Sequence, residues 1–599
     1  MTGSEQALLR CNGLAEKFAG VPEGGQFVVA QTDFEQGLGF LAAWHLWRQT
    51  NTQPHACLHF LAAVPGQMDL DALIRAGAQC PTLAPLATEL AEHYPSFMAG
   101  THRMILDRGR VRLTLCFSDI GCAGKNMSFK ADAWFLSQSA PLADSEHARR
   151  QAAMIIARHS KPGTSFAGVC CGPQLPELLS DAGFTVSQVP DQSGGPALLI
   201  GELPGGQETD DPALQPTRHS IAIVGAGIAG CLLASNLAMR GLHVTLIDQA
   251  GAVGSGASGN RQGALYVKLG VDYNDQTELA LSSLLFSQRF YRLFAGKGWH
   301  PTGLLQLAYN DKEADRQARL LAKNHYPSTV FQPVTADQAS RIAGIPIPHG
   351  GFWFPASGWL QPDTLCQTLA REPGIEHRMG FSVATMARPD EDEHPRWCLT
   401  SESGETLSFD SVVLCAGPDT PELIPLKGQY RMKPIRGQIT EVPENCLNTP
   451  SVVVCGPGYV NPAFQHRALV GATFDLHDSC PEPSGKSDQE NLRMLGDLLP
   501  GALTESGIGD IARQSNGRVA FRCTTHDYQP VAGPMKTSRG VLLDDLYLFT
   551  GLGSKGLTYA PLLAEYLGDL ISGQPPCLPG NLIKRLDTQR CHRPGADPH

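Results

Sequence analysis

The stretch IAIVGAGIAGCLLASNLAMRGLHVTLID, residues Ile221–Asp248, decides the fold of the chain. The apolar residues 221–224 predict a fully buried strand, residues 231–240 predict a helix, and residues 244–247 predict a second strand. Strand, helix and strand in this order form a βαβ unit, which is the building block of a parallel sheet. The chain is therefore expected to contain an α/β domain that begins near residue 220.

The turn of this unit carries three glycines with dinucleotide-binding spacing, Gly225, Gly227 and Gly230. In such a turn the first glycine permits a tight bend, the second lets the backbone approach a pyrophosphate, and the third lets helix and strand pack closely. The helix N-terminus supplies free N–H groups for the phosphates. Asp248 ends the second strand, where a carboxylate accepts hydrogen bonds from a ribose. The complete unit predicts dinucleotide binding.

The composition is that of a globular enzyme with several domains. A length of 599 residues suggests three or four folding units, and the net charge of -11 argues against a strongly basic nucleic-acid binder, although a local basic surface is compatible with it. No apolar run is long enough to cross a membrane and the N-terminus does not resemble a signal peptide, so we expect a cytoplasmic protein. The 17 cysteines include no CxxC pair, which indicates reduced thiols and no metal site.

Residues 1–200 are expected to form a separate α/β domain with a mostly parallel sheet. Apolar and alternating patterns predict helices and strands in turn, with strands at 26–30, 57–62, 110–117 and 131–136 and helices at 39–49, 73–93 and 147–159. Residues 201–219, rich in Gly, Pro and Asp, are interpreted as a linker.

The loop that follows Asp248 is rich in small residues and lets the backbone come close to a ligand. Because it follows the ribose-binding strand directly, we expect cofactor contacts from Ser258, Asn260, Arg261, Gln262 and Gly263. Further along, helices are predicted at 276–294 and 311–322, and strands at 381–386, 397–400 and 411–415. These strands are expected to rejoin the dinucleotide-binding sheet, and the last one runs into Gly417, a further expected cofactor contact. Residues 425–520 are expected to form an α+β substrate domain.

A second glycine-rich turn occurs near the C-terminus between a predicted strand at 546–550 and a predicted helix at 557–571. Its spacing could indicate a second nucleotide such as NADPH, but no further strand with a terminal acid follows it. We therefore expect this turn to close over the far end of the first cofactor through Gly551, Gly553, Ser554 and Gly556. Residues 581–599 are basic and are interpreted as a solvated tail, with phosphate contact as the alternative.

Several motifs together resemble the superfamily of FAD-dependent D-amino acid oxidases and glycine oxidases. They are the Gly225 turn, the SGNRQG loop, PIRGQIT (residues 434–440), FRCTTHDYQPVAGP (residues 521–534) and TGLGSKGL (residues 550–557). Within that superfamily, GASGNRQGALY (residues 256–266) and CGPGYVNPA (residues 455–463) resemble the bifunctional tRNA 5-methylaminomethyl-2-thiouridine biosynthesis family. That family joins an N-terminal Rossmann-like methyltransferase domain to a C-terminal oxidase.

The resemblance implies a cofactor, a substrate and a set of catalytic residues. FAD would serve the removal of the carboxymethyl group from carboxymethylaminomethyl-uridine at the tRNA wobble position, which leaves the aminomethyl form. By motif position, Arg522 is the candidate that binds the substrate carboxylate, with a structural ion pair as its other interpretation and Arg436 as the alternative residue. Tyr459 and Lys555 are expected to line the flavin ring or the entrance. A separate methyltransferase could be a partner, and we expect a monomer.

The first domain departs from the methyltransferase pattern at three places. Asp33 and Glu35 replace two glycines of the first turn, where they add bulk and negative charge. No acid follows the second strand, which ends in Ala62-Ala63-Val64, and Ser137-Gln-Ser-Ala-Pro141 replaces the family's DGFAP segment. We therefore expect a folded domain that does not methylate and that needs S-adenosylmethionine only if it is active.

Three other functions stay open from the sequence. The first is an intact bifunctional enzyme that binds S-adenosylmethionine by an unusual turn. The second is an oxidase of free glycine, sarcosine or D-amino acids. The third is a non-catalytic RNA-binding protein, which bound FAD in the purified protein would argue against.

Overall fold

The structure is a computed structural model that describes residues 3–137, 145–169, 174–190, 197–205, 219–389, 395–423, 430–504 and 507–593. Most of the predicted linker, the Cys170-Cys171 pair, residues 138–141 and the last six residues of the basic tail lie outside these ranges. The chain divides into two compact units. Unit 1 comprises residues 1–218, 239–242 and 568–583, and unit 2 comprises residues 219–238, 243–567 and 584–599.

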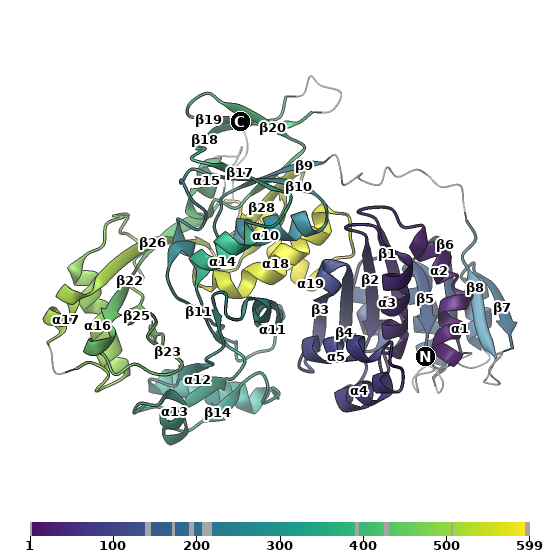
Figure 1. Ribbon diagram of the computed structural model, residues 1–599, viewed down its shortest axis with the longest axis horizontal. Helices are drawn as coiled ribbons and strands as arrows, with labels where there is room; N and C mark the ends of the chain where they lie inside the picture. Colours follow the sequence, from purple (N-terminus) through teal and green to yellow (C-terminus); the bar gives the residue numbers. More distant parts are fainter. Residues whose placement is uncertain are drawn as a thin grey trace. The chain divides into compact units, whose positions relative to one another are not determined.

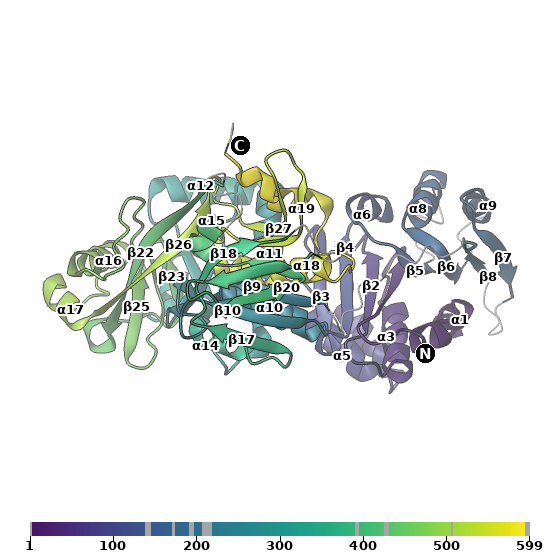
Figure 2. The ribbon, with the colours of Figure 1, turned by 90° about the horizontal axis from the view of Figure 1, so that it is seen from above.

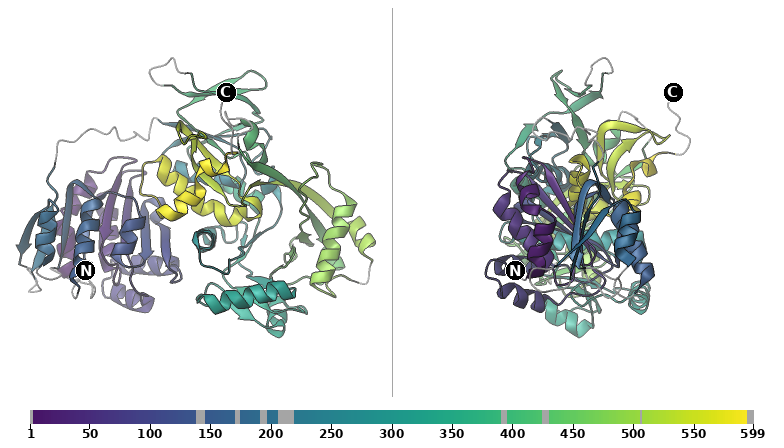
Figure 3. Two further views of the ribbon diagram at one scale, coloured as in Figure 1. Left: turned by 180° about the vertical axis from the view of Figure 1, so that it is seen from behind. Right: turned by 90° about the vertical axis from the view of Figure 1, so that its right-hand side faces the viewer.

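Unit 1 is built on an eight-stranded sheet in the order β3-β4-β2-β1-β5-β6-β8-β7, with helices on both faces (Figures 1 and 3). The five central strands, β4 to β6, are parallel, and β3, β8 and β7 are antiparallel at the edges. The strands are β1 Gln26–Gln31, β2 Cys57–Ala63, β3 Gly100–Leu106, β4 Val111–Phe117, β5 Ala131–Leu136, β6 Ser160–Val169, β7 Thr185–Val189 and β8 Leu198–Glu202.

The helices of unit 1 bury aromatic residues against this sheet, including Trp44, Trp47 and Phe18, each fully buried. The predicted helix over residues 73–93 is two helices, because Pro81 lies between them and cannot continue a helix. The helices of the N-terminal part are α1 Gly3–Cys11, α2 Leu14–Ala19, α3 Leu38–Thr50, α4 Leu70–Ala78, α5 Ala84–His93, α6 Ile120–Asn126, α8 Glu146–Arg158 and α9 Gln174–Asp181.

The first sheet of unit 2 has the order β17-β10-β9-β21-β28-β27 (Figure 2). Its strands are parallel except β27, so the carboxyl ends of β9, β10, β21 and β28 meet at one edge. The elements are β9 Ser220–Val224, α10 Ile228–Met239, β10 His243–Asp248, β17 Ile375–Met379, β21 Ser411–Leu414, β27 Val531–Lys536, β28 Leu542–Thr550 and α18 Gly556–Ile571. Helix α10 begins at residue 228, three residues before the predicted start.

The predicted return of three strands to this sheet is correct only for residues 411–415. The strands predicted at 381–386 and 397–400 form a separate antiparallel sheet, β18-β19-β20. Its strands are β18 Val383–Ala387, β19 Trp397–Ser401 and β20 Thr406–Phe409. Another short sheet, β11-β16-β12, consists of β11 Gly263–Leu265, β12 Trp299–His300 and β16 Gly358–Leu360.

The second large sheet of unit 2 has eight strands in the order β14-β15-β13-β23-β24-β25-β22-β26. The substrate domain was predicted to begin at residue 425, but this sheet also contains strands from earlier in the chain, since β13 pairs with β23. Helices α16 and α17 lie beside β22 and β25 (Figures 1 and 2) and bury Leu492 and Leu495 in its core. The strands are β13 Leu304–Leu307, β14 Gln332–Val334, β15 Gly351–Phe354, β22 Met432–Pro443, β23 Val453–Cys455, β24 Tyr459–Val460, β25 Arg467–Gly471 and β26 Asn516–Thr525.

The remaining helices connect these sheets. They are α11 Asp275–Tyr291, α12 Asp311–Lys323, α13 Ala336–Ala343, α14 Pro362–Leu369, α15 Thr420–Leu423, α16 Gly485–Leu498, α17 Ile508–Gln514 and α19 Gly580–Leu586. The basic end of the chain is not simply solvated, since Leu586 and Cys591 are fully buried and Arg590 pairs with Asp527.

Candidate functional site

The turn after β9 has the backbone geometry that a bound pyrophosphate requires. Gly225 has a φ of 110°, and a Cβ there would overlap with the carbonyl of Cys415. A Cβ at Gly230 would overlap with the carbonyl oxygen of Gly225. At Gly227, in contrast, Oγ of Ser258, at 3.4 Å, is the only atom of the described residues that would lie within 4 Å of a Cβ. Two of the glycines therefore serve packing, and the third leaves the backbone open to a ligand.

Asp248 and Ser258 are both attached to this turn. The carboxylate of Asp248 accepts the N–H of Ala226 at 2.7 Å and that of Ala250 at 2.8 Å. Oγ of Ser258 accepts the N–H of Ile228 at 2.9 Å, at the first residue of α10. The acid at the end of β10 and the small-residue loop are thus fixed beside the glycine turn, where a ribose and a phosphate would lie.

The second glycine turn lies next to the first. Gly551 and Gly553 have φ values of 72° and 56°, and a Cβ at Gly556 would lie 3.6 Å from the Ile228 side chain. Helices α10 and α18 therefore begin side by side, with two positive helix ends towards one ligand. Gly417 accepts a hydrogen bond from Thr550 at 3.4 Å, and Ser554 is exposed.

Arg518, which sequence reasoning missed, holds the small-residue loop in place. Its guanidinium donates to Oδ1 of Asn260 at 2.6 Å and to the carbonyls of Gly256 at 2.6 Å and Ser255 at 3.1 Å. Burial lowers the pKa of Arg518. Arg518 lies four residues before Arg522 in β26, so both side chains lie on the same face of the strand. This spacing is visible in the sequence and could have indicated Arg518.

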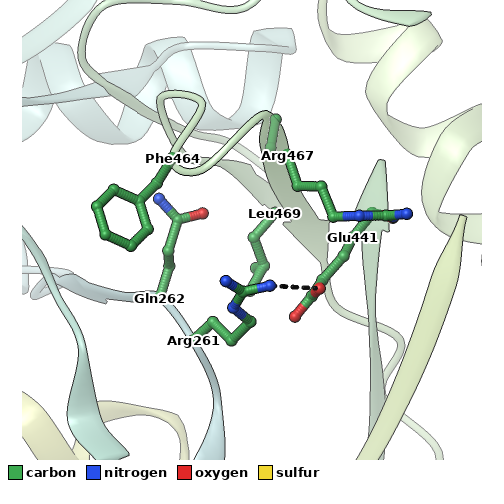
Figure 4. Close-up of a pocket in the computed structure, with 7 residues that line it drawn as sticks. Arg261, Gln262, Glu441, Phe464, Arg467 and Leu469 are labelled. Carbon is green, nitrogen blue, oxygen red and sulfur yellow. Dashed lines mark hydrogen bonds and ion pairs between the residues drawn. The ribbon is translucent and has the colours of Figure 1, made fainter. Parts of the chain in front are cut away.

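Arg261 and Gln262 join this loop to the second sheet. Figure 4 shows the Arg261 guanidinium directed at Glu441, at 3.6 Å, in a pocket that Phe464 and Arg467 also line. Arg261 also donates to Gln465, and Nε2 of Gln262 donates to the Pro462 carbonyl at 3.0 Å. Gly263 follows in β11, where a Cβ would lie 2.6 Å from Leu557.

Arg522 is a half-buried cation on β26. Its Nη1 donates to the Thr473 carbonyl at 3.2 Å, and its Cζ lies 5.9 Å from the centre of the Phe474 ring. Within the described ranges no carboxylate pairs with it, and burial lowers its pKa. A Cβ at Gly437 would overlap with the Arg522 guanidinium, so the glycine of PIRGQIT lets this side chain cross strand β22.

Arg436 has a different environment, although it lies in the neighbouring strand. Its Nε donates to the Cys480 carbonyl at 2.7 Å and lies 3.3 Å from Asp478, and its Nη2 donates to the Glu482 carbonyl at 2.8 Å. The side chain is buried. Its donors are therefore used to fix the segment around residues 478–482.

Tyr459 lies close to Arg522, and the two side chains influence each other. Burial raises the pKa of Tyr459 to about 12, and the Arg522 charge acts in the opposite direction. Two residues further on, Asn461 is fully buried, and neither polar atom of its side-chain amide has a partner among the described residues. The amide of Asn461 can therefore bind ordered water or a ligand. No motif or spacing in the sequence pointed to Asn461.

Lys555 is half-buried just before α18. Burial lowers its pKa, and the charge of Lys268 lowers it further. Lys268 is itself paired with Glu313 at 2.9 Å, whereas in the described part of the chain no anion pairs with Lys555. The structure thus brings Arg522 and Tyr459 together and leaves Lys555 as a separate cation at a helix start.

The corresponding turn in unit 1 is closed. The N–H of Phe34 donates to the Ala63 carbonyl at 2.8 Å, and Oγ of Ser137 donates to the Asp33 carbonyl at 2.7 Å, so the ends of β1, β2 and β5 are bonded to one another. Phe34 is fully buried, and a Cβ at Gly37 would lie 3.0 Å from its ring. The Phe34 ring therefore packs against Gly37, and the bulk and charge of Asp33 and Glu35 at this turn fit the carboxylate of S-adenosylmethionine poorly.

In unit 2, the open glycine turn, Asp248 beside it and the two adjoining helix starts fit FAD, and together they define a flavin-dependent oxidoreductase. Residues 220–570 match the family of FAD dependent oxidoreductases, and residues 81–200 match the S-adenosyl-L-methionine-dependent methyltransferases. The second match leaves out the closed turn of unit 1.

The whole chain has curated relatives. It is 47% identical over 97% of its length to the tRNA 5-methylaminomethyl-2-thiouridine biosynthesis bifunctional protein MnmC of Marinobacter nauticus, of which it covers 92%. To the protein of that name from Hahella chejuensis it is 33% identical, over 97% of this chain and 93% of the relative. The chain therefore belongs to the family of these bifunctional proteins.

Solved structures are similar in fold. A glycine oxidase from Bacillus cereus aligns with 59% of this chain and 95% of its own, at 20% identity and a TM-score of 0.50. An L-proline dehydrogenase from P. horikoshii aligns with 63% and 98%, at 18% identity and a TM-score of 0.51. Among the described residues no helix is both long and apolar enough to cross a membrane, and no cluster of side chains has the makeup of a metal site.

Proposed function

We propose that unit 2 oxidatively removes the carboxymethyl group from 5-carboxymethylaminomethyl-(2-thio)uridine at the wobble position of tRNA, leaving the aminomethyl form. FAD, when bound, supplies the hydride acceptor for the carbon between the nitrogen and the carboxylate. Water then hydrolyses the substrate imine and releases glyoxylate. The observation that carries this proposal is Arg522, a half-buried cation without a carboxylate partner in the described part of a flavin domain.

Arg522, rather than Arg436, is proposed to bind the substrate carboxylate. A guanidinium binds a carboxylate with two parallel hydrogen bonds, each contributing about 1.5–3 kcal/mol. The donors of Arg436 are already used by the Cys480 and Glu482 carbonyls. Tyr459 and Asn461 lie on the same side of the chain as alternate residues and are proposed to line the space next to Arg522.

The cofactor residues proposed from the sequence keep their proposed roles. Gly225, Gly227, Gly230 and Asp248 would hold the adenosine half of FAD, and the loop from Ser258 to Gly263 and the turn from Gly551 to Gly556 would hold the remainder. Lys555 would lie near the flavin ring. We further propose a cytoplasmic location, since tRNA is the proposed substrate, and a monomer, since one chain carries all the proposed FAD residues.

Unit 1 is proposed not to methylate, so another protein would add the methyl group. The closed turn around Phe34 supports this over the intact bifunctional enzyme that the relatives' name describes. The rival oxidase of free amino acids is distinguished by hydrogen peroxide production, which would occur with glycine or sarcosine and be lost when tRNA replaces them.

Nucleoside analysis of tRNA from cells that lack this protein tests the proposal. Carboxymethylaminomethyl-uridine should accumulate, and a plasmid copy of the gene should remove it. A plasmid copy with R522Q provides the matched comparison, because it removes only the proposed carboxylate ligand. Unchanged tRNA in the deletion strain would exclude the proposed reaction.

A further inference from the structure

Phe474 is an exposed aromatic residue on a rigid backbone. The side chain is 52% exposed, and it lies in the segment that follows β25. The residues on either side are fixed to β22, because Thr473 donates to the Gln438 carbonyl at 3.1 Å, and Asp475 and Arg436 exchange backbone hydrogen bonds at 3.0 and 3.1 Å. The exposed ring lies beside the cation proposed to bind the substrate carboxylate, since Cζ of Arg522 is 5.9 Å from its centre.

Phe474 lies on the same face of strand β22 as the proposed carboxylate site. Thr473 is buried and accepts the N–H of Gln438 with its hydroxyl at 2.8 Å, so Phe474, the next residue, points to the opposite side. That side also carries Gly437, over which Arg522 crosses to reach the Phe474 ring. Arg436 fixes the segment beyond Phe474 through its bonds to residues 480 and 482.

We propose that Phe474 is a stacking platform for the uracil base of the wobble nucleotide, whose modified arm then extends to Arg522. This inference rests on the proposed function. The arm joins C5 of the base to the carboxylate carbon through four single bonds, which when extended span about 5 Å. The Phe474 ring centre and Cζ of Arg522 are 5.9 Å apart, so one nucleotide can contact both. Proteins that read single-stranded RNA loops commonly stack unpaired bases on aromatic side chains.

The proposal gives the site two parts with different selectivity. Arg522 would recognise any glycine-like carboxylate, including that of a small amine. Phe474 would add affinity only when a planar base is attached, because stacking needs a ring on both partners. The platform would thereby favour the nucleotide over free amino acids.

The test compares two substrates in the flavin-loaded full-length enzyme. One is tRNA carrying carboxymethylaminomethyl-uridine, and the other is N-ethylglycine, which has the arm without the base. F474A should lower the ratio of kcat/KM for tRNA to kcat/KM for N-ethylglycine about tenfold, mainly through KM, and F474W should keep the ratio within about twofold of the wild type. L476A is the matched control, since Leu476 is 50% exposed in the same segment, and it should not change the ratio.

Each outcome decides one question. An unchanged ratio in F474A, or an equal fall in L476A, would overturn the platform. An equal loss on both substrates would show that Phe474 acts only on Arg522, and it would also overturn the proposal. If the wild-type enzyme releases no glyoxylate from the tRNA, the proposed function fails, and this result is separate from any effect of residue 474.

Discussion

The two units contain the same strand-turn-helix arrangement at the carboxyl end of a parallel sheet, with opposite results for a ligand. In unit 2 the turn leaves the backbone of Gly227 uncovered, and Asp248 lies beside it. In unit 1 the ring of Phe34 packs against Gly37 of the turn, and Ser137 donates to Asp33 between neighbouring strand ends. The comparison teaches that the fold supplies only the place for a nucleotide, whereas small residues and an acid at that place make it a site.

The largest effect is expected from closing the open turn. G225A should prevent FAD binding and abolish turnover, because the residue requires a φ of 110° and a Cβ would overlap with Cys415. Flavin absorbance of the purified protein measures this. G251A is the control, since nothing lies within 4 Å of a Cβ there. A yellow, active G225A variant would break the contrast between the two turns.

The next effect concerns Arg522, the cation proposed to bind the substrate in unit 2. R522Q should lower kcat/KM about 100-fold, because it removes two charged hydrogen bonds of about 1.5 kcal/mol each. Glyoxylate release from modified tRNA measures it, with bound flavin unchanged. R493Q, on the exposed side of α16, is the control and should retain full activity. Equal rates in R522Q and the wild type would contradict the assignment of Arg522.

A smaller effect on FAD binding is expected from changing Arg518, which holds the loop after Asp248 in place. R518K keeps the positive charge but replaces the fork that donates to Asn260, Gly256 and Ser255. We expect FAD to bind about tenfold more weakly, as measured by fluorescence titration of the apoprotein. R513K on α17 should bind FAD normally. Unaltered affinity in R518K would mean that the loop needs no such support.

The smallest effect is on stability. The pKa of Lys555 in the folded protein lies below its ordinary value of 10.5, because the side chain is buried near Lys268. The unfolded chain then binds more protons, so this residue's contribution to stability rises with pH up to about its ordinary pKa. K555M should raise the Tm of the apoprotein at neutral pH by about 2 °C and flatten its pH dependence. K312M, at an exposed position of α12, should change neither, and a lower Tm in K555M would show a missed anionic partner.

The sequence predicted the parts that depend on local periodicity and glycine spacing. Strand β5 and the βαβ unit from residue 220 were predicted closely, because most of their residues are apolar and buried and the spacing of the glycines marks the turn of the βαβ unit. The break at Pro81 was predictable in principle, whereas the edge strand β7 was not, since its residues are largely exposed and follow no apolar pattern.

Prediction of the candidate site was limited by contacts between distant residues. Arg522 and Arg436 were indistinguishable by motif, and only the folded chain shows that Arg436 binds the carbonyls of residues 480 and 482. Three residues were missed. Arg518 acts on Asn260, which is 258 residues away in the chain. Asn461 stands out only by its buried amide without partners among the described residues, and Phe474 only by its exposed side chain. Periodicity carries no information on such pairs.

One assay tests most directly whether the nucleotide chemistry is confined to unit 2. The purified flavin-loaded protein is incubated with carboxymethylaminomethyl-uridine tRNA, oxygen and S-adenosylmethionine, and the nucleosides are analysed by mass spectrometry. We predict accumulation of aminomethyl-uridine with glyoxylate and no methylated product. Appearance of methylaminomethyl-uridine would contradict this account, because it would require S-adenosylmethionine to bind at the turn that Phe34 closes.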